Sequence, residues 1–182
     1  GLRDVLARAP ELREIRDNSP LVTAALHRLL LAVVHRCYGP ESDEAWLALC
    51  KAGEFDSSVF DSYFQKWHQR FDLFDPARPF YQNTEEEVRE AKSHPVDALA
   101  HELASGNNAT LFDHSVSEAS RPVKPADAAR LLVATQNYAL GGGVSKPFNL
   151  RHAPLVGGAW VLHVGKNFFE TLLLNMLVIT KD

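Results

Sequence analysis

The sequence predicts an α+β fold, a mainly helical globular domain with a few short strands. Serine or proline helix-start signals precede several segments whose apolar residues recur at three- and four-residue spacing. Strand-like patterns are confined to short stretches. The hydrophobic share of 46% and the charged share of 23% are those of an ordinary folded protein. A chain of 182 residues is long enough for a core of its own, so we expect a single domain over residues 1–182.

Helix-start and helix-stop signals in the first third of the chain predict three helices. Ser19 and Pro20 supply an N-cap and a first helical residue for a helix over 20–38, which stops at Gly39 and Pro40. Ser42 opens a second helix over 43–52, ended by Gly53. A third helix over 57–70 begins at Ser57 or Ser58. Its aromatic residues share one face, and we interpret them as a packed stripe rather than a base-stacking platform: Phe60, Tyr63, Phe64 and Trp67.

The central part of the chain predicts less regular structure. Pro76 and Pro79 mark the stretch FDLFDPARPFYQNTEEEV as an ordered connector whose acidic run at 85–87 faces solvent. A short helix, VDALAHELA, follows Pro95, and Thr110 to Phe112 is expected to form a brief strand or an extended loop.

The last third predicts two helices and one strand. Pro125 starts a helix over 125–139 whose C-terminus is the glycine run of YALGGGVSKPFNL. Residues 159–164 (AWVLHV) have the composition of a strand, and 167–178 reads as a buried helix. We expect the 20–38 helix to form the core with the helices over 57–70, 125–139 and 167–178.

Several features bear on compartment and completeness. No apolar run approaches the roughly 18 residues that a membrane helix needs, and no secretory signal is visible. Cys37 and Cys50 lie in unrelated helical patterns, which indicates buried thiols in a reducing compartment. We therefore expect a cytoplasmic protein without a membrane partner. The chain starts at Gly1, and an apolar pattern is still running at its end, so we expect a fragment of a larger protein.

Charge is unevenly distributed along the chain. The net charge is −4, but residues 1–120 carry 12 basic and 20 acidic side chains, whereas residues 121–182 carry 7 basic and 3 acidic ones. The basic surplus therefore coincides with the glycine run. A local positive field can attract phosphate even on an acidic protein, because salt confines the interaction to about 10 Å. A solvated basic tail would give the same pattern.

The glycine run itself has two interpretations. Gly141, Gly142 and Gly143 carry a high cost in backbone entropy, so they indicate positive φ angles or a close approach to another surface. A spacer and a surface laid against nucleic acid both fit. The run is not a phosphate-binding P-loop, because the glycines of that motif are separated by four residues and follow a strand.

Enzymatic motifs are weak in this sequence. His101 and Glu102 lack the second histidine of a metalloprotease helix, because Ser105 occupies its position. Asp113 and His114 form the most suggestive polar pair, but a metal site needs three or more ligands and no matching cluster accompanies them. We expect no enzyme, no metal and no cofactor. A metal-dependent hydrolase using Asp113 and His114, or a helical scaffold without nucleic-acid contact, stays open as an alternative.

Five ordered segments together resemble a known family. They are HRLLLAVVHR, FDLFDPARPFYQN, SGNNATLFDH, AARLLVATQNYALGGG and GKNFFETLLLNML. In this order they resemble the N-terminal domain of the CasA family, the large subunit of the type I-E CRISPR Cascade complex. The resemblance covers nearly all 182 residues and implies that the C-terminal helical bundle of that family is absent from this chain.

The resemblance implies a non-catalytic recognition subunit of a crRNA-guided antiviral complex. Gly141, Gly142 and Gly143 match a family loop that reads the protospacer-adjacent motif (PAM) of target double-stranded DNA. The minor groove is about 6 Å wide, so a backbone without side chains suits its floor. Lys146 follows the loop, and with Arg151 we expect it to neutralise phosphates. The implied partners are crRNA, target double-stranded DNA, the other Cascade subunits and the helicase-nuclease recruited for target degradation.

A second matching segment is expected to reach crRNA and neighbouring subunits. An exposed phenylalanine could stack on a base, and paired asparagines offer donors and acceptors. The alternative is a capped helix end whose phenylalanine turns into the core. The residues of this docking loop are Asn107, Asn108, Thr110, Leu111 and Phe112.

Overall fold

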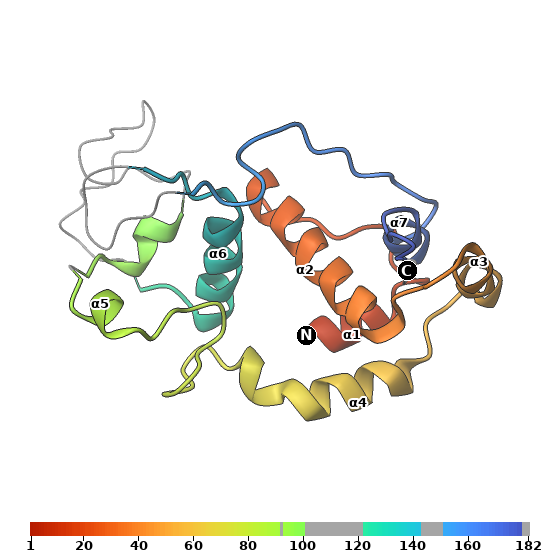
Figure 1. Cartoon of the computed structure of the whole chain (residues 1–182), viewed down its shortest axis with the longest axis horizontal. Helices are drawn as coiled ribbons and strands as arrows, with labels where there is room; N and C mark the ends of the chain where they lie inside the picture. Colours follow the sequence, from red (N-terminus) through yellow and green to blue (C-terminus); the bar gives the residue numbers. More distant parts are fainter. Residues whose placement is uncertain (92, 101–121, 143–150, 180–182) are drawn as a thin grey trace. The chain divides into compact units, whose positions relative to one another are not determined.

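The computed structural model describes residues 1–91, 93–100, 122–142 and 151–179. The chain divides into two compact units (Figure 1). The first unit comprises Gly1–His68 and Trp160–Asp182, and the second comprises Gln69–Ala159. Each is described by itself below, and the expectation that they form one domain stays a prediction.

The first unit is helical in its described residues and is built around one long helix. This helix, α2 (Pro20–Tyr38), begins and ends as predicted, because the Ser19 hydroxyl accepts a hydrogen bond from the Val22 N–H and Gly39 follows its last turn. The sequence also predicted α3 (Asp43–Ala52) correctly, with Ser42 as its N-cap and Gly53 as its left-handed C-cap. The other helices of this unit are α1 (Leu2–Ala7), α4 (Ser57–Trp67) and α7 (Phe168–Leu174).

Packing in the first unit centres on α2, which contacts α4 and α7. An aromatic cluster joins these helices: Phe60 and Phe55 lie 5.6 Å apart by ring centroids, and Phe55 and Phe169 lie 4.7 Å apart. Phe60 is fully buried, so the predicted aromatic stripe of α4 is confirmed as a packed face. The N-terminus of α7 is tied to the chain that follows α1, since the Phe168 N–H donates to the Leu12 carbonyl at 2.8 Å and the Phe169 N–H to the Ala9 carbonyl at 3.1 Å.

By length and mean hydropathy, α2 could cross a membrane, so the expectation that no apolar run reaches that length is wrong for this helix. Its buried residues nevertheless pack inside the first unit. His27 is also buried, with its Nδ1 2.8 Å from the Thr23 carbonyl oxygen. The core position of α2 therefore accounts for its apolar composition.

One N-cap and two helix ends of the first unit differ from the sequence predictions. α4 begins at Ser57, as predicted, but its N-cap is Asp56, whose carboxylate accepts the Ser58 N–H at 2.9 Å. It ends at Trp67, after which the chain tightens into a 3-10 turn, η1 (His68–Phe71). α7 ends at Leu174 rather than at residue 178, because the Asn175 side chain donates to the Thr171 carbonyl at 2.6 Å.

The strand predicted over residues 159–164 is wrong, since these residues have no regular secondary structure. A strand requires a neighbouring strand to pair its backbone groups, and none of the described residues supplies one. The described part of the chain is helical, so the few short strands are not observed there.

The second unit is arranged around α6 (Pro125–Tyr138), which starts at Pro125 as predicted. It ends at Tyr138, three residues before Gly141, and its C-cap is the extended residue Ala139 instead of the expected glycine run. The Gln136 side chain donates to the Tyr81 carbonyl at 3.2 Å and thus joins α6 to the predicted connector. In that connector, Phe80 is buried.

Two short elements complete the second unit. α5 (Glu86–Arg89) lies in the acidic run, whose three glutamates are exposed as predicted. The helix expected after Pro95 is a 3-10 turn, η2 (Val96–Leu99), over its described residues. Thr135 of α6 donates to the Leu99 carbonyl at 3.2 Å, which fixes this turn beside α6.

His35 of α2 accepts a hydrogen bond from the backbone of the residues that follow α7. The Leu177 N–H donates to His35 Nε2 at 3.2 Å, and this requires an unprotonated Nε2. Nδ1 is buried and finds no acceptor in the part of the chain that the structure describes. Burial lowers the pKa of His35 below its ordinary value of 6.5. The neutral imidazole is therefore the form that suits the folded state.

This arrangement predicts a pH-dependent stability. Because the pKa of His35 is lower in the folded than in the unfolded protein, its contribution is fully present above pH 6.5 and is lost as pH falls through the folded pKa. Urea unfolding at pH 7.5 and 5.0 should show a smaller pH dependence for His35→Gln, whose amide oxygen accepts at any pH. His94→Gln, at an exposed histidine, is the control. Equal pH dependence in wild type and His35→Gln would contradict the prediction.

Candidate nucleic-acid interface

In the second unit, the residues that lead into the glycine run are hydrogen-bonded to the residues that follow Leu150. Residues 137–142 lie beside residues 151–155: the Ala153 N–H donates to the Ala139 carbonyl and the Leu155 N–H to the Asn137 carbonyl, each at 2.9 Å. The Gly141 N–H donates to His152 Nδ1 at 3.0 Å. We call these two stretches the loop base. The hydrogen bonds of the loop base hold residues 137–142 beside residues 151–155.

The loop base is anchored in the interior of the second unit. Asn137, in the last turn of α6, is 1% exposed, and its side chain donates to the Val133 carbonyl at 2.7 Å. Leu155 is 4% exposed on the opposite stretch. Both stretches are thus fixed by buried residues, so the segment between them starts from a defined position.

Gly141 and Gly142 are glycines for different reasons. A Cβ on Gly141 would lie 2.4 Å from the backbone carbon of Arg151, so the two stretches approach too closely for any side chain. Gly142 has a φ of +105°, which residues with a side chain rarely adopt, and a Cβ there would meet no atom of the described residues within 4 Å. Among the described residues, the backbone at Gly141 is therefore packed and that at Gly142 is not. Gly143 lies outside the described residues.

The stretch of sequence that contains the loop base is basic. The sequence has no carboxylate between Asp127 and Glu170, a range that contains Lys146 and Arg151. Arg151 is exposed, and its backbone touches Gly141 in the loop base. The structure thus brings together Gly141, Gly142 and Arg151 among the predicted residues.

Sequence reasoning missed His152, whose ring accepts the Gly141 N–H. Its position beside Arg151, directly after the loop, was the only available signal. Other predicted site residues lie outside the described residues, as does the Asp113–His114 pair of the hydrolase alternative: Lys146, Asn107, Asn108, Thr110, Leu111 and Phe112.

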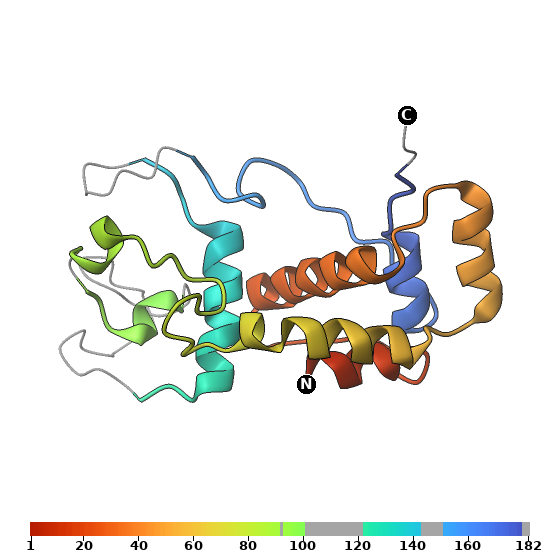
Figure 2. The ribbon, with the colours of Figure 1, turned by 60° about the horizontal axis from the view of Figure 1, so that its bottom comes forward.

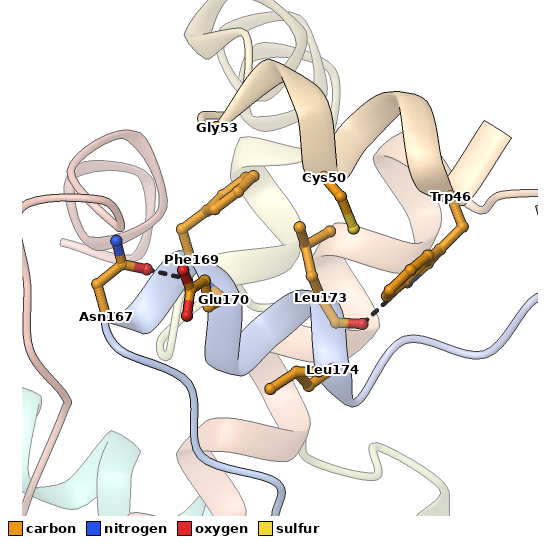
Figure 3. A pocket seen from close by; sticks show the side chains of 8 residues that line it. All are labelled: Trp46, Cys50, Gly53, Asn167, Phe169, Glu170, Leu173 and Leu174. Atoms are coloured by element: carbon orange, nitrogen blue, oxygen red, sulfur yellow. Dashed lines mark hydrogen bonds between the residues drawn. The ribbon is translucent and has the colours of Figure 1, made fainter. Parts of the chain in front are cut away.

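A pocket of about 480 Å³ lies in the first unit between α3 and α7 (Figure 3). Trp46 closes one end by donating from its ring N–H to the Leu173 carbonyl at 3.0 Å. Glu170 is engaged with the Lys166 N–H at 2.8 Å, and burial raises the pKa of the Cys50 thiol, so the thiol is a poor nucleophile. The lining residues therefore offer no nucleophile and base pair. None of the predicted site residues lines this pocket.

Metal and disulfide chemistry find little support where the structure describes the chain. Among those residues, no group of three or more histidine, cysteine, aspartate or glutamate side chains could hold a metal ion. Cys37 and Cys50 are free thiols of intermediate exposure, whereas the sequence predicted buried ones. Burial raises the pKa of the Cys37 thiol as well.

Comparisons with known proteins give one consistent result. The family model of CRISPR-associated protein Cse1 matches residues 1–182. CRISPR-associated protein CasA/Cse1 of Thermus thermophilus is 40% identical over 188 residues, covering 100% of this chain and 36% of that protein. The chain therefore spans about a third of the length of the relative.

Solved structures agree with this similarity. Cse1 of Thermobifida fusca matches with a TM-score of 0.82 at 27% identity, over 98% of this chain and 35% of its own. A chain of a CRISPR RNA-guided surveillance complex matches with a TM-score of 0.83 at 30% identity, over 97% of this chain and 38% of its own. The described helices thus share the fold of the corresponding part of these proteins.

Proposed function

Because the chain belongs to the Cse1 family of CRISPR-associated proteins, we propose that it is part of a target-recognition subunit of a crRNA-guided surveillance complex. In this proposal the glycine loop reads the PAM of target double-stranded DNA, and the subunit performs no catalysis. Its partners are crRNA, the other Cascade subunits and the helicase-nuclease that degrades the target. The complex acts in the cytoplasm.

The observation that carries this proposal is the contrast between the two glycines. Gly141 is packed against the backbone of Arg151, whereas Gly142 has a positive φ and room for a Cβ among the described residues. A rigid, side-chain-free surface is what the narrow minor groove accepts. Minor-groove readout distinguishes mainly A·T from G·C pairs, which suits a tolerant reader of a short tag.

The basic residues have a positioning role in this proposal. Arg151 is the first residue of the second stretch of the loop base, and its backbone lies against Gly141. Lys146 lies in the sequence between the two stretches. Contacts of lysine and arginine with phosphates set orientation and affinity, whereas contacts with base edges carry specificity. We assign Lys146 and Arg151 to phosphates and the glycines to the base edges.

The docking loop belongs to the same proposal. Asn107, Asn108, Thr110, Leu111 and Phe112 would contact the guide RNA and neighbouring subunits, with Phe112 stacking on a base or entering a subunit pocket. This assignment rests on the family resemblance of SGNNATLFDH. It separates guide binding from reading of the DNA tag along the chain.

The test is a fluorescence-anisotropy titration of duplexes with and without the candidate tag, using the full-length subunit assembled in its crRNA complex. Gly142→Asp should lose the preference for tagged duplex by about tenfold or more, because it places a carboxylate and a strained backbone where DNA would lie. Gly158→Asp adds the same charge in the second unit at an open glycine without a positive φ, and should keep the preference.

A third variant separates strain from recognition. Gly53→Asp introduces aspartate at another positive-φ glycine, in the first unit, and should lower the melting temperature without changing the tag preference. If wild type and Gly142→Asp bind both duplexes alike, the glycines are a spacer and the recognition proposal fails. A wild-type complex that assembles but ignores the tag would favour the scaffold alternative.

A further inference from the structure

His152 of the loop base holds the amide of a glycine. Its ring Nδ1 accepts the Gly141 N–H at 3.0 Å, and the Ala153 N–H, next in the chain, donates to the Ala139 carbonyl at 2.9 Å. Figure 2 shows the two stretches of the loop base side by side beyond the end of α6. Gly141 is therefore held by a side chain as well as by the backbone contacts of its neighbours.

The hydrogen bond to Gly141 fixes the proton of the His152 ring. A neutral imidazole has one donor and one acceptor nitrogen, so a ring that accepts at Nδ1 carries its proton on Nε2. The two nitrogens point to different sides of the ring, and Nε2 therefore faces away from Gly141. His152 is exposed, and its Nε2–H has no acceptor in the part of the chain that the structure describes. The loop base thus presents a hydrogen-bond donor of fixed direction.

A neutral donor at this place suits the floor of the DNA minor groove. An A·T pair presents only acceptors there, whereas a G·C pair adds a donor, the guanine N2 amino group. An N–H that points to this edge is therefore satisfied by an A·T pair and opposed by the guanine amino group. Phosphates are matched better by cations, and Lys146 and Arg151 already have that role in the proposed function.

We propose that His152 is a positioning and specificity residue for the DNA tag: Nδ1 holds the Gly141 N–H, and Nε2–H donates to a base-edge acceptor in the minor groove. This inference rests on the proposed function, since it requires the loop base to lie against DNA. It adds a direction of preference, because at one position of the tag a pair without the guanine amino group is favoured. The glycine backbone supplies the close approach, and the adjacent imidazole supplies the discrimination.

Two substitutions separate the roles of the two ring nitrogens. His152→Asn places its side-chain oxygen where Nδ1 lies, so it keeps the acceptor for Gly141 and lacks the Nε2–H, whereas His152→Ala removes both. His94→Asn, at an exposed histidine of the second unit, is the control. In the full-length subunit, the Gly141 amide should exchange about three- to tenfold faster in His152→Ala, the usual net effect of one hydrogen bond. His152→Asn should leave this exchange unchanged.

DNA binding is measured by fluorescence anisotropy, with the full-length subunit assembled in its crRNA complex. The duplexes carry G·C or inosine·C at each tag position in turn, because inosine lacks only the N2 amino group of guanine. At one position, wild type and His94→Asn should bind the inosine duplex about three- to tenfold more tightly than the G·C duplex. His152→Asn and His152→Ala should both lose this difference.

Three results would overturn the inference. The first is discrimination by His152→Asn equal to that of wild type, because this variant has no Nε2–H. The second is an equal loss of affinity for G·C and inosine·C duplexes, which would assign the donor to a phosphate. The third is unchanged Gly141 exchange in His152→Ala.

The same titrations distinguish this inference from the proposed function. If wild type binds tagged and untagged duplexes alike, the proposed function itself fails, and the inference fails with it. If wild type prefers the tag and both His152 variants behave as wild type, the proposed function stands and only the role of His152 is overturned.

Discussion

Phe60→Ala is expected to lower the free energy of unfolding by about 3–5 kcal/mol, the cost typical of truncating a fully buried phenylalanine. Phe60 is 0% exposed and joins Tyr38 of α2 and Phe55, each 5.6 Å away by ring centroids. Removing the ring would leave a cavity in the cluster through which α2 and α4 pack. Urea unfolding of the full-length protein, followed by tryptophan fluorescence, measures the loss.

A matched substitution makes this prediction specific to burial. Phe74 is 72% exposed, so Phe74→Ala deletes the same ring from the surface and should change stability by less than about 0.5 kcal/mol. Similar losses for the two variants would show that the aromatic cluster is not the centre of the first unit. The comparison holds the chemistry of the substitution constant and changes only the environment.

Helix boundaries could be predicted from the sequence where local chemistry determines them. Ser19 with Pro20 and Ser42 with Gly53 are caps that act within one turn, so α2 and α3 were predicted to the residue. The N-cap of α4 was missed, although its first residue was predicted, because Asp56 and the two serines after it are all good N-caps. The choice among adjacent capping residues depends on the path of the preceding chain.

Longer-range features could not be predicted in this way. The early end of α7 depends on Asn175, whose side chain bonds backbone groups of Thr171 and His163, and the second of these lies twelve residues away. Residues 159–164 show the same limit, because periodicity records a preference for strand but cannot supply a partner. Local propensity therefore identified the character of this stretch and not its structure.

The sequence could predict the residue types of the candidate site but not the hydrogen bonds that hold the loop base together. The glycine run and the basic surplus identified the region, and the resemblance assigned it a function. Nothing in the sequence indicated that Ala139 and Ala153 would bond, or that His152 would accept the Gly141 N–H. The Ala139–Ala153 contact joins two backbone groups, where residue identity carries little information, and the His152 contact joins a side chain to a backbone group eleven residues away.

The loop base gives the second large prediction. Gly141→Ala should weaken the loop base by about 1–3 kcal/mol, because its Cβ would lie 2.4 Å from the Arg151 carbonyl carbon and 2.5 Å from its oxygen. Both obstacles are backbone atoms, so the two stretches must separate. Amide exchange at Ala153 and Leu155, the donors of the loop base, should accelerate roughly tenfold.

Binding should change together with this local opening. A loop that leaves a loosened base loses its fixed position, so we expect Gly141→Ala to reduce the preference for tagged duplex in the assembled complex. Gly158→Ala, at an open glycine of the same unit, should leave both amide exchange and preference unchanged. Faster exchange with full tag preference would mean that recognition does not require a rigid loop base. Unchanged exchange would mean that the close approach of Gly141 to Arg151 is not maintained in solution. Because the two measurements are independent, they separate a failure of the geometry from a failure of the proposed function.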